Sequence, residues 1–186
     1  MADRDLRVTQ SVDAAIREHG KATYPHECCG ALVGQDGRAT SVVALPNTTE
    51  EGPRRRFLVR PSDYREAERR ASELGAELLG FYHSHPDHPA RPSQYDLDHA
   101  WPTFAYVIVS VTGQSAALPR RSADLSRQSA QGAAAEGATA EGAKAGDMTV
   151  WFLKDDRSSF EEGSLHHGEN PHPDPAQAVH GQTGRG

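Results

Sequence analysis

The chain has 186 residues, 36 % of them apolar, and a formal net charge of −6. Domains run to roughly 100–200 residues, so the length predicts one domain with additional segments, and the acidic balance argues against a general nucleic-acid binder, which needs a basic face to neutralise phosphates. No apolar run approaches the ~20 residues that cross a bilayer, and the charged start MADRDLRVTQ lacks the apolar stretch of a signal peptide, so we expect a cytoplasmic protein.

The first predicted elements are a helix and a pair of strands. In residues 8–19 the apolar positions recur at the spacing of one helix face. We expect Thr9 to cap the start of this helix and Gly20 to end it. Residues 28–47 predict two strands joined at QDG, which is a hairpin turn signal. A third strand is expected at 54–60, RRRFLVR.

The middle of the chain predicts two more helices and two buried strands. Residues 61–75 predict a helix with proline in its first turn and glycine at its end. Its expected apolar face consists of Tyr64, Ala67, Ala71 and Leu74. Residues 76–85, AELLGFYHSH, are apolar and short, as in a buried strand. A proline-rich loop, a short helix from 93 to about 101 and a strand at 104–111, FAYVIVSV, follow.

The composition changes after this strand. Residues 119–147 include the near-repeat AEGATAEGAKAG, which is too poor in apolar side chains to bury a core and is expected to be a mobile insertion. Order is expected to resume at 148–156 and 158–165, two strands around a turn. We therefore expect residues 1–165 to form a single domain that contains the insertion, and residues 166–186 to form a disordered C-terminal tail.

The densest group of metal-binding side chains follows the strand predicted at 76–85. His83 and His85 are two positions apart at a strand end, so both side chains leave the same face of the sheet. Asp96, in the first turn of the short helix, is near enough in sequence to turn back toward them. Two histidines and one carboxylate leave the fourth position of a zinc ion open for water, as in hydrolytic sites, and zinc lowers the pKa of that water to roughly 7.

A hydrolytic site also needs a proton acceptor that is not a metal ligand. Glu27, in the segment YPHECCGALVG, stands at the head of the first strand predicted in residues 28–47. Spacing alone does not place its carboxylate beside the metal.

These residues match a known pattern. His83, His85, Ser93 and Asp96 fit H-x-H-x7-S-x2-D in full, and with the upstream Glu27 the chain resembles the JAMM (MPN-plus) metallopeptidases. The segments PHECCG and HSHP resemble the small bacterial members in particular. The resemblance extends from about residue 8 to residue 165, apart from the insertion. It implies an α/β (α+β) fold with a mixed, curved β-sheet flanked by helices, the cytidine-deaminase-like architecture of JAMM/MPN domains.

The resemblance also implies a role for each residue of the pattern. His83, His85 and Asp96 would bind one zinc ion (Zn2+) per chain. Glu27 would hydrogen-bond the zinc-activated water, act as general base and then protonate the leaving amine. Ser93 would stabilise the oxyanion of the tetrahedral intermediate, a contribution of ~3 kcal/mol in comparable enzymes.

Simpler interpretations exist for several of these residues. Ser93 and Asp96 also form a capping-box pattern, with Ser93 as N-cap, and both roles are compatible. Cys28 and Cys29 are adjacent, so a disulfide is not expected, and we predict small, buried packing residues. His88 is expected to be an exposed loop residue, with substrate contact as the alternative.

The predicted function is that of a zinc-dependent peptidase or isopeptidase. By resemblance, its partner would be a ubiquitin-like protein, in bacteria a sulfur carrier, with a C-terminal Gly-Gly; no nucleic acid or membrane is expected. A diglycine tail has no side chains to clash in a narrow cleft and can pair with a strand edge. The alternatives are a non-catalytic binding module for a ubiquitin-like protein, and the same chemistry on a small-molecule amide or a ubiquitin-like conjugate of a bacterial defence system.

Overall fold

The computed structural model describes residues 4–47, 59–113 and 146–169. They form one eight-stranded sheet in the order β7-β6-β5-β4-β2-β3-β1-β8, with helices packed on it. The elements are β1 (Asp5–Thr9), α1 (Gln10–Thr23), β2 (Cys29–Gln35), β3 (Arg38–Leu45), α2 (Pro61–Glu73), β4 (Glu77–Pro86), α3 (Gln94–His99), β5 (Ala105–Val111), β6 (Met148–Leu153), β7 (Phe160–Glu162) and β8 (Ser164–Gly168). β4 pairs with β5, and β1 with β3 and β8, in parallel, while the remaining pairs are antiparallel. The mixed sheet with flanking helices predicted from the sequence is confirmed.

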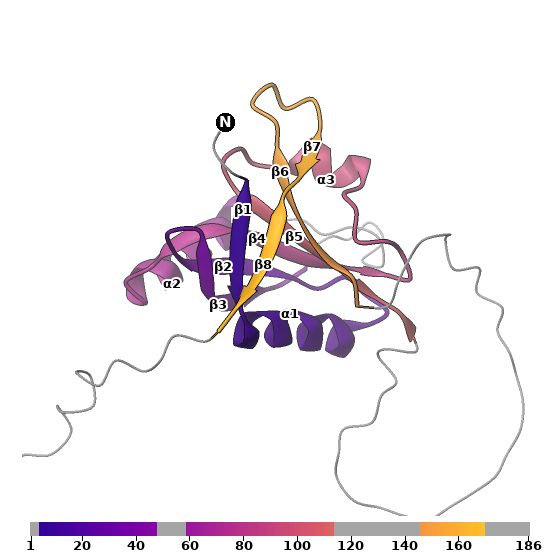
Figure 1. The fold of residues 1–186 in the computed structure, drawn as a ribbon, viewed down its shortest axis with the longest axis horizontal. Coiled ribbons are helices and arrows are strands. Elements are labelled where there is room, and N and C mark those ends of the chain that lie inside the picture. Colours follow the sequence, from indigo (N-terminus) through magenta and orange to yellow (C-terminus); the bar gives the residue numbers. More distant parts are fainter. Residues whose placement is uncertain (1–3, 48–58, 114–145, 170–186) are drawn as a thin grey trace, which may run out of the picture.

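The two faces of the sheet carry separate cores because neighbouring strand residues point to opposite sides. On one face α1 contributes Val12 and Ile16, which belong to the same buried cluster as Tyr82 of β4. On the other face Ala67 of α2 packs in a cluster with Phe81 of β4. Figure 1 shows α1 lying along one face of the curved sheet, with β1 and β8 crossing in front of the central strands. No helix in the described ranges is long and apolar enough to cross a membrane.

The first helix begins as predicted but ends later. The Thr9 side chain caps α1 by accepting from the Val12 N–H. Val8, expected on the apolar face of the helix, lies in strand β1 instead, because it pairs with β3 and β8, which come later in the chain. Gly20 does not stop the helix. A Cβ there would lie 2.8 Å from Val111 Cγ2, so glycine at this position allows α1 to approach the sheet closely.

The predicted hairpin and second helix are also present. Asp36 and Gly37 both have positive φ, 51° and 67°, as a two-residue type I′ turn between β2 and β3 requires. Pro61 opens α2 at the N1 position. Leu74, expected on the buried face, is 60 % exposed and is the C-cap residue that follows the last residue of α2.

The strand boundaries differ from prediction at two places. Of the strand expected at 54–60, residues 54–58 lie outside the described residues, and Val59 and Arg60 are not in a strand. After the β6–β7 hairpin, β8 extends to Gly168 and pairs in parallel with β1, so residues 166–168, expected in the disordered tail, lie in a strand. The reason is again a pairing with a distant segment, which the local sequence does not show. The predicted insertion, up to residue 145, and residues 170–186 lie outside the described residues.

Candidate active site

The central strand β4 presents His83 and His85 on one face of the sheet. Both side chains point to the face that carries α2 and α3, while Ser84 between them points to the α1 face, as strand alternation requires. β4 is held between β2 and β5 on its two edges. His83 is fully buried and His85 is 7 % exposed. The two imidazoles are therefore attached to a backbone segment that is held in place on both edges.

The short helix α3 brings Asp96 to the same place. Ser93 is its N-cap and forms a capping box with Asp96. The Ser93 N–H and hydroxyl donate to Asp96 Oδ2 at 2.6 and 2.8 Å, and the Asp96 N–H donates to Ser93 Oγ at 3.2 Å. The capping interaction predicted from the sequence thus fixes the turn that presents the Asp96 carboxylate, which is 6 % exposed.

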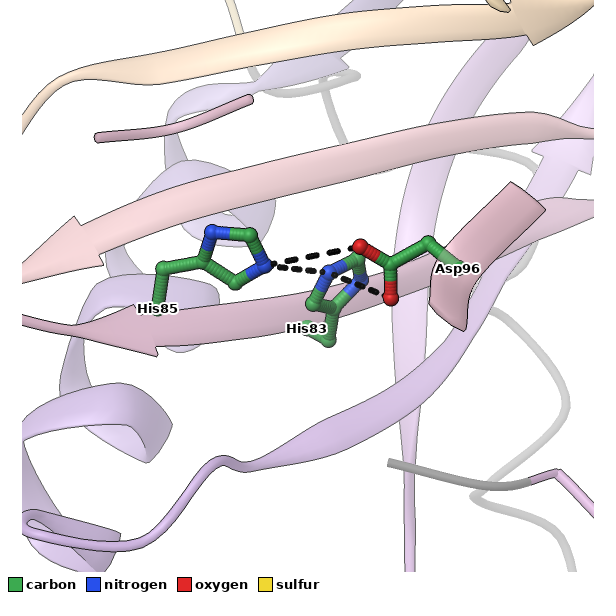
Figure 2. A group of neighbouring side chains, drawn as sticks. All are labelled: His83, His85 and Asp96. Atoms are coloured by element: carbon green, nitrogen blue, oxygen red, sulfur yellow. Dashed lines mark hydrogen bonds and ion pairs between the residues drawn. The ribbon is translucent and has the colours of Figure 1, made fainter. Parts of the chain in front are cut away.

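The three side chains form a compact group. Figure 2 shows both imidazoles of β4 directed toward the Asp96 carboxylate on α3. His83 Nε2 lies 3.0 Å from His85 Nε2, and the two nitrogens lie 3.6 and 3.7 Å from Asp96 Oδ1 and Oδ2. One ligand atom from each residue lies within 4.8 Å of the others. This spacing suits three ligands converging on a single small cation.

The hydrogen bonds around the group favour metal binding. His85 Nδ1 donates to the Pro89 carbonyl at 2.9 Å, which leaves the Nε2 lone pair directed at the group. A carbonyl acceptor behind a histidine is the usual way in which a metal ligand is oriented. Two imidazole nitrogens and one carboxylate are also the donor set of hydrolytic zinc sites. The residues present therefore fit a zinc ion.

The electrostatics of the group set the protonation states of its three side chains. Burial opposes ionisation of Asp96, but the adjacent imidazoles and the hydrogen bonds hold its pKa well below the usual range. Burial lowers the pKa of His83. Burial also acts to lower the pKa of His85, but the hydrogen bond to Asp96 and the neighbouring carboxylates raise it. The fold thus keeps an ionised carboxylate next to an imidazole that is neutral at neutral pH.

The strand pairing brings Glu27 to the same site. Cys29 is the ladder partner of His83 in the antiparallel β2–β4 pair. One residue earlier, the Cys28 N–H donates to Ser84 Oγ at 2.9 Å and the Ser84 N–H donates to the Cys28 carbonyl at 3.1 Å. Continuing this register places Glu27 opposite His85.

The Glu27 carboxyl group is buried beside His83, His85 and Asp96. Asn47 anchors its backbone by donating from Nδ2 to the Glu27 carbonyl at 3.1 Å. The side chain is 5 % exposed. Burial raises the pKa of Glu27 to about 8; the nearby His85 lowers it and Asp96 raises it further. Sequence reasoning singled out Glu27 without being able to place it, because only strand pairing brings it to the ligands.

A pocket of about 350 Å³ opens over this group. Its lining residues are Glu27, His85, His88, Pro89, Arg91 and Ser93. His88, expected to be exposed, is half-buried in this lining. Sequence reasoning missed Arg91 and the Pro89 carbonyl, since a backbone acceptor and a lone arginine in a loop leave no recognisable pattern. The pocket combines a buried acid, a serine hydroxyl and a possible metal centre.

The adjacent cysteines are packing residues, as predicted. Cys28 and Cys29 are both buried, and neither forms a disulfide. They point to opposite faces of the sheet, Cys28 into the core under α1 and Cys29 into the core under α2. Burial raises the pKa of both thiols, that of Cys29 to about 12, so neither is a thiolate at neutral pH.

Comparison with known proteins assigns the family. The family model for prokaryotic homologs of the JAB domain matches residues 9–125. A desampylase of Haloferax volcanii is 33 % identical over 110 residues, which cover 58 % of this chain and 78 % of that protein. A probable TtuB-protein conjugate cleaving protease of Thermus thermophilus is 33 % identical over 113 residues, covering 61 % and 75 %.

A solved structure supports the same assignment. The solution structure of a protein from Salinibacter ruber is 34 % identical, covers 90 % of this chain and 95 % of that chain, and superposes with a TM-score of 0.57. The matched residues 9–125 contain Glu27 and the whole H-x-H-x7-S-x2-D pattern. The chain belongs to the prokaryotic JAB-domain family, the small bacterial branch of the JAMM/MPN proteins, and is a hydrolase.

Proposed function

We propose that this chain is a zinc-dependent peptidase or isopeptidase that hydrolyses the amide bond after the C-terminal Gly-Gly of a ubiquitin-like protein of the sulfur-carrier kind. The observation that carries the proposal is the burial of the Glu27 carboxyl group in the same pocket as His85, beside the His83–His85–Asp96 group. Two relatives named as a desampylase and a conjugate cleaving protease support cleavage of ubiquitin-like conjugates.

Three residues would hold the metal. His83 and His85 would bind through Nε2 and Asp96 through its carboxylate, the atoms that already converge. A bound zinc ion supplies Lewis acidity, which polarises a carbonyl and makes water a nucleophile near neutral pH. The hydrogen bond from His85 Nδ1 to the Pro89 carbonyl keeps that imidazole in the tautomer required for binding.

Glu27 would transfer a proton from the attacking water to the leaving amine. Burial raises its pKa to about 8 in the metal-free protein, and a cation bound beside it would favour the ionised form, which is the form that accepts a proton. Glu27 takes a proton from the attacking water as the new C–O bond forms. It then returns this proton to the leaving amine as the C–N bond breaks, so that the carboxyl group ends in its starting state.

Ser93 would stabilise the negative charge on the carbonyl oxygen. Its hydroxyl lines the pocket and donates to Asp96 Oδ2 in the substrate-free protein. Rotation of the hydroxyl toward the substrate costs Asp96 one hydrogen bond, while the Ser93 N–H keeps its own bond to the same oxygen. In comparable acyl-transfer enzymes, such a donor lowers the activation barrier by ~3 kcal/mol.

The test is hydrolysis of a carrier-protein fusion whose diglycine is followed by further residues. The protein is purified without added metal, its zinc content is measured, and the cleaved products are identified by mass spectrometry. We expect cleavage after Gly-Gly by the wild type and a rate at least ~100-fold lower for Glu27→Gln, because the general base is lost. Equal rates for the two proteins, or cleavage elsewhere, would refute the proposal; zinc content and melting temperature serve as controls for folding of the variant.

A further inference from the structure

Arg91 places a positive charge at the edge of the active-site pocket. It lines the pocket together with Glu27, His85 and Ser93. Its side chain is exposed. The mechanism above gives Arg91 no role, although its guanidinium is the one permanent cation among the described residues that line this pocket.

The loop that carries Arg91 is held in place on several sides. Ser110 Oγ donates to the His88 carbonyl at 2.8 Å, and the Arg91 N–H donates to the Pro89 carbonyl at 2.8 Å. The Ala90 carbonyl accepts from Thr149 Oγ1 at 2.5 Å and from Trp151 Nε1 at 3.3 Å. The backbone of Arg91 is therefore fixed relative to the ligands, because Pro89 also holds His85.

Most arginines in the described ranges have an acceptor for the guanidinium. Ion pairs with Asp or Glu, or bonds to a backbone carbonyl, are made by Arg4, Arg17, Arg38, Arg60, Arg69, Arg70 and Arg157. The Arg91 guanidinium makes no such ion pair or hydrogen bond with the described residues. The same is true of Arg7 and Arg65, which do not line the pocket. Arg91 thus combines an available guanidinium with a fixed backbone at the site of reaction.

We infer that Arg91 determines specificity by binding a carboxylate on the leaving side of the scissile amide. A guanidinium matches a carboxylate through two parallel hydrogen bonds. This inference rests on the proposed function, because that function fixes where the carboxylate can be. The diglycine has no side chains and its own carboxyl group forms the amide, so an anion next to the bond belongs to the leaving group.

The chemistry of the two kinds of leaving group narrows the substrate class. An isopeptide-linked lysine in a folded target has its backbone carboxyl group tied up in a peptide bond, several ångströms from the ε-amine. A single residue joined to Gly-Gly through its α-amine has a free α-carboxylate two bonds from the leaving nitrogen. A pocket of about 350 Å³ suits one such residue. The preferred substrate is therefore a carrier that ends in Gly-Gly plus one residue.

The experiment compares two forms of one carrier that ends in Gly-Gly-Ala, with a free carboxylate or with a carboxamide. We expect the wild type to hydrolyse the carboxylate form about fivefold faster in kcat/KM, as an ion pair at the edge of solvent allows. Arg91→Gln should bring the ratio close to one. Arg65→Gln removes the same charge from an exposed position on α2 and should leave the wild-type ratio unchanged. A wild-type ratio near one, or an unchanged ratio in Arg91→Gln, overturns the inference.

A binding measurement separates this inference from the proposed function. The affinities of Glu27→Gln and of Glu27→Gln/Arg91→Gln for both carrier forms are measured by calorimetry, without hydrolysis. A preference for the carboxylate form that disappears with Arg91 supports the inference even if the wild type cleaves neither carrier, an outcome that would refute the proposed function alone. Equal affinity of Glu27→Gln for the two forms overturns the inference even if cleavage after Gly-Gly occurs.

Discussion

Glu27 has a carboxyl group that the fold buries before any substrate is present. At 5 % exposure it lies next to Asp96, whose negative charge adds to the effect of burial, and the pKa of Glu27 is raised to about 8. The metal-free protein therefore keeps this group protonated at neutral pH. A cation bound by the neighbouring ligands would favour the ionised form, so metal binding and the state of Glu27 are coupled.

The raised pKa of Glu27 predicts a pH dependence of stability in the metal-free protein. Between the ordinary pKa of 4.5 and about 8, folded Glu27 holds a proton that the unfolded chain has released. The free energy of unfolding contributed by Glu27 therefore falls as pH rises through this window, by up to ~1.4 kcal/mol per pH unit. Urea unfolding of the wild type and of Glu27→Gln, both with chelator, measures it. We expect the difference in stability between the two to shift in favour of the variant from pH 5 to pH 8; a constant difference contradicts the account.

Ser93 is the N-cap of α3 and the proposed oxyanion donor, and measuring stability and kcat on one variant separates the two roles. Ser93→Ala removes an N-cap, which costs about 1 kcal/mol of stability, and removes the proposed oxyanion donor, which costs about 100-fold or more in kcat. Stability is measured by urea unfolding and kcat on zinc-loaded protein. A cap alone predicts lower stability with unchanged kcat per zinc, and that result would eliminate the oxyanion role. Ser158→Ala, at an exposed turn, is the control for loss of a hydroxyl.

At the scale of elements, the position of the site depends on how closely β4 approaches its neighbours. β4 pairs in parallel with β5, where Gly80 is opposite Ala105. A Cβ at position 80 would lie 2.0 Å from the Ala105 carbonyl oxygen, which is a backbone atom and cannot move without shifting the strand. The first rung of the β4–β5 ladder is thus a contact that only glycine permits.

Gly80→Ala is therefore predicted to destabilise the protein by about 1–3 kcal/mol or more, since the strands must separate. Gly168→Ala in β8 is the matched control, because the nearest atom to its added Cβ would be Arg38 Nη2 at 3.8 Å. We expect that control to change stability by no more than about 0.5 kcal/mol. Equal urea midpoints for the two variants would show that the β4–β5 spacing is not what glycine provides.

The grouping of the site residues could be predicted from the sequence where they lie close together in the chain, but not where distant strands pair. His83, His85, Ser93 and Asp96 lie in one short segment, so strand alternation and the capping pattern together predict their grouping. β1 and the extension of β8 were not predicted, because both depend on parallel pairing between distant segments. The place of Glu27 depends on the antiparallel register of Cys29 with His83, which local patterns do not specify. Gly20 was wrongly predicted to end the helix. Glycine is needed there for close packing against Val111, a tertiary contact that the local sequence does not show.

At the scale of the whole molecule, the predicted insertion joins two neighbouring strands. Val109 of β5 and Met148 of β6 are ladder partners, and the Gly146 N–H donates to the Ser110 carbonyl at 3.0 Å. The two ends of the connection are thus side by side in the sheet. A much shorter connection could join them without strain, and a shorter loop costs less closure entropy.

Replacing residues 119–145 with a short Gly-Ser linker is predicted to leave the melting temperature within about 3 °C of the wild type. The segment is poor in large apolar residues, so little burial is lost. Differential scanning calorimetry of both proteins measures the change. A fall of about 10 °C or more would mean that the segment contributes to the folded core.

The central claim is that one metal ion bound by His83, His85 and Asp96 makes this fold a hydrolase, and the zinc content of the purified protein tests it most directly. Inductively coupled plasma mass spectrometry of protein prepared without added metal should find one zinc ion per chain. His83→Ala and Asp96→Ala should each lose that ion, while His167→Ala, which changes an exposed histidine on β8, should retain it. Wild-type protein without zinc, or the same zinc content in all three variants, would contradict the account.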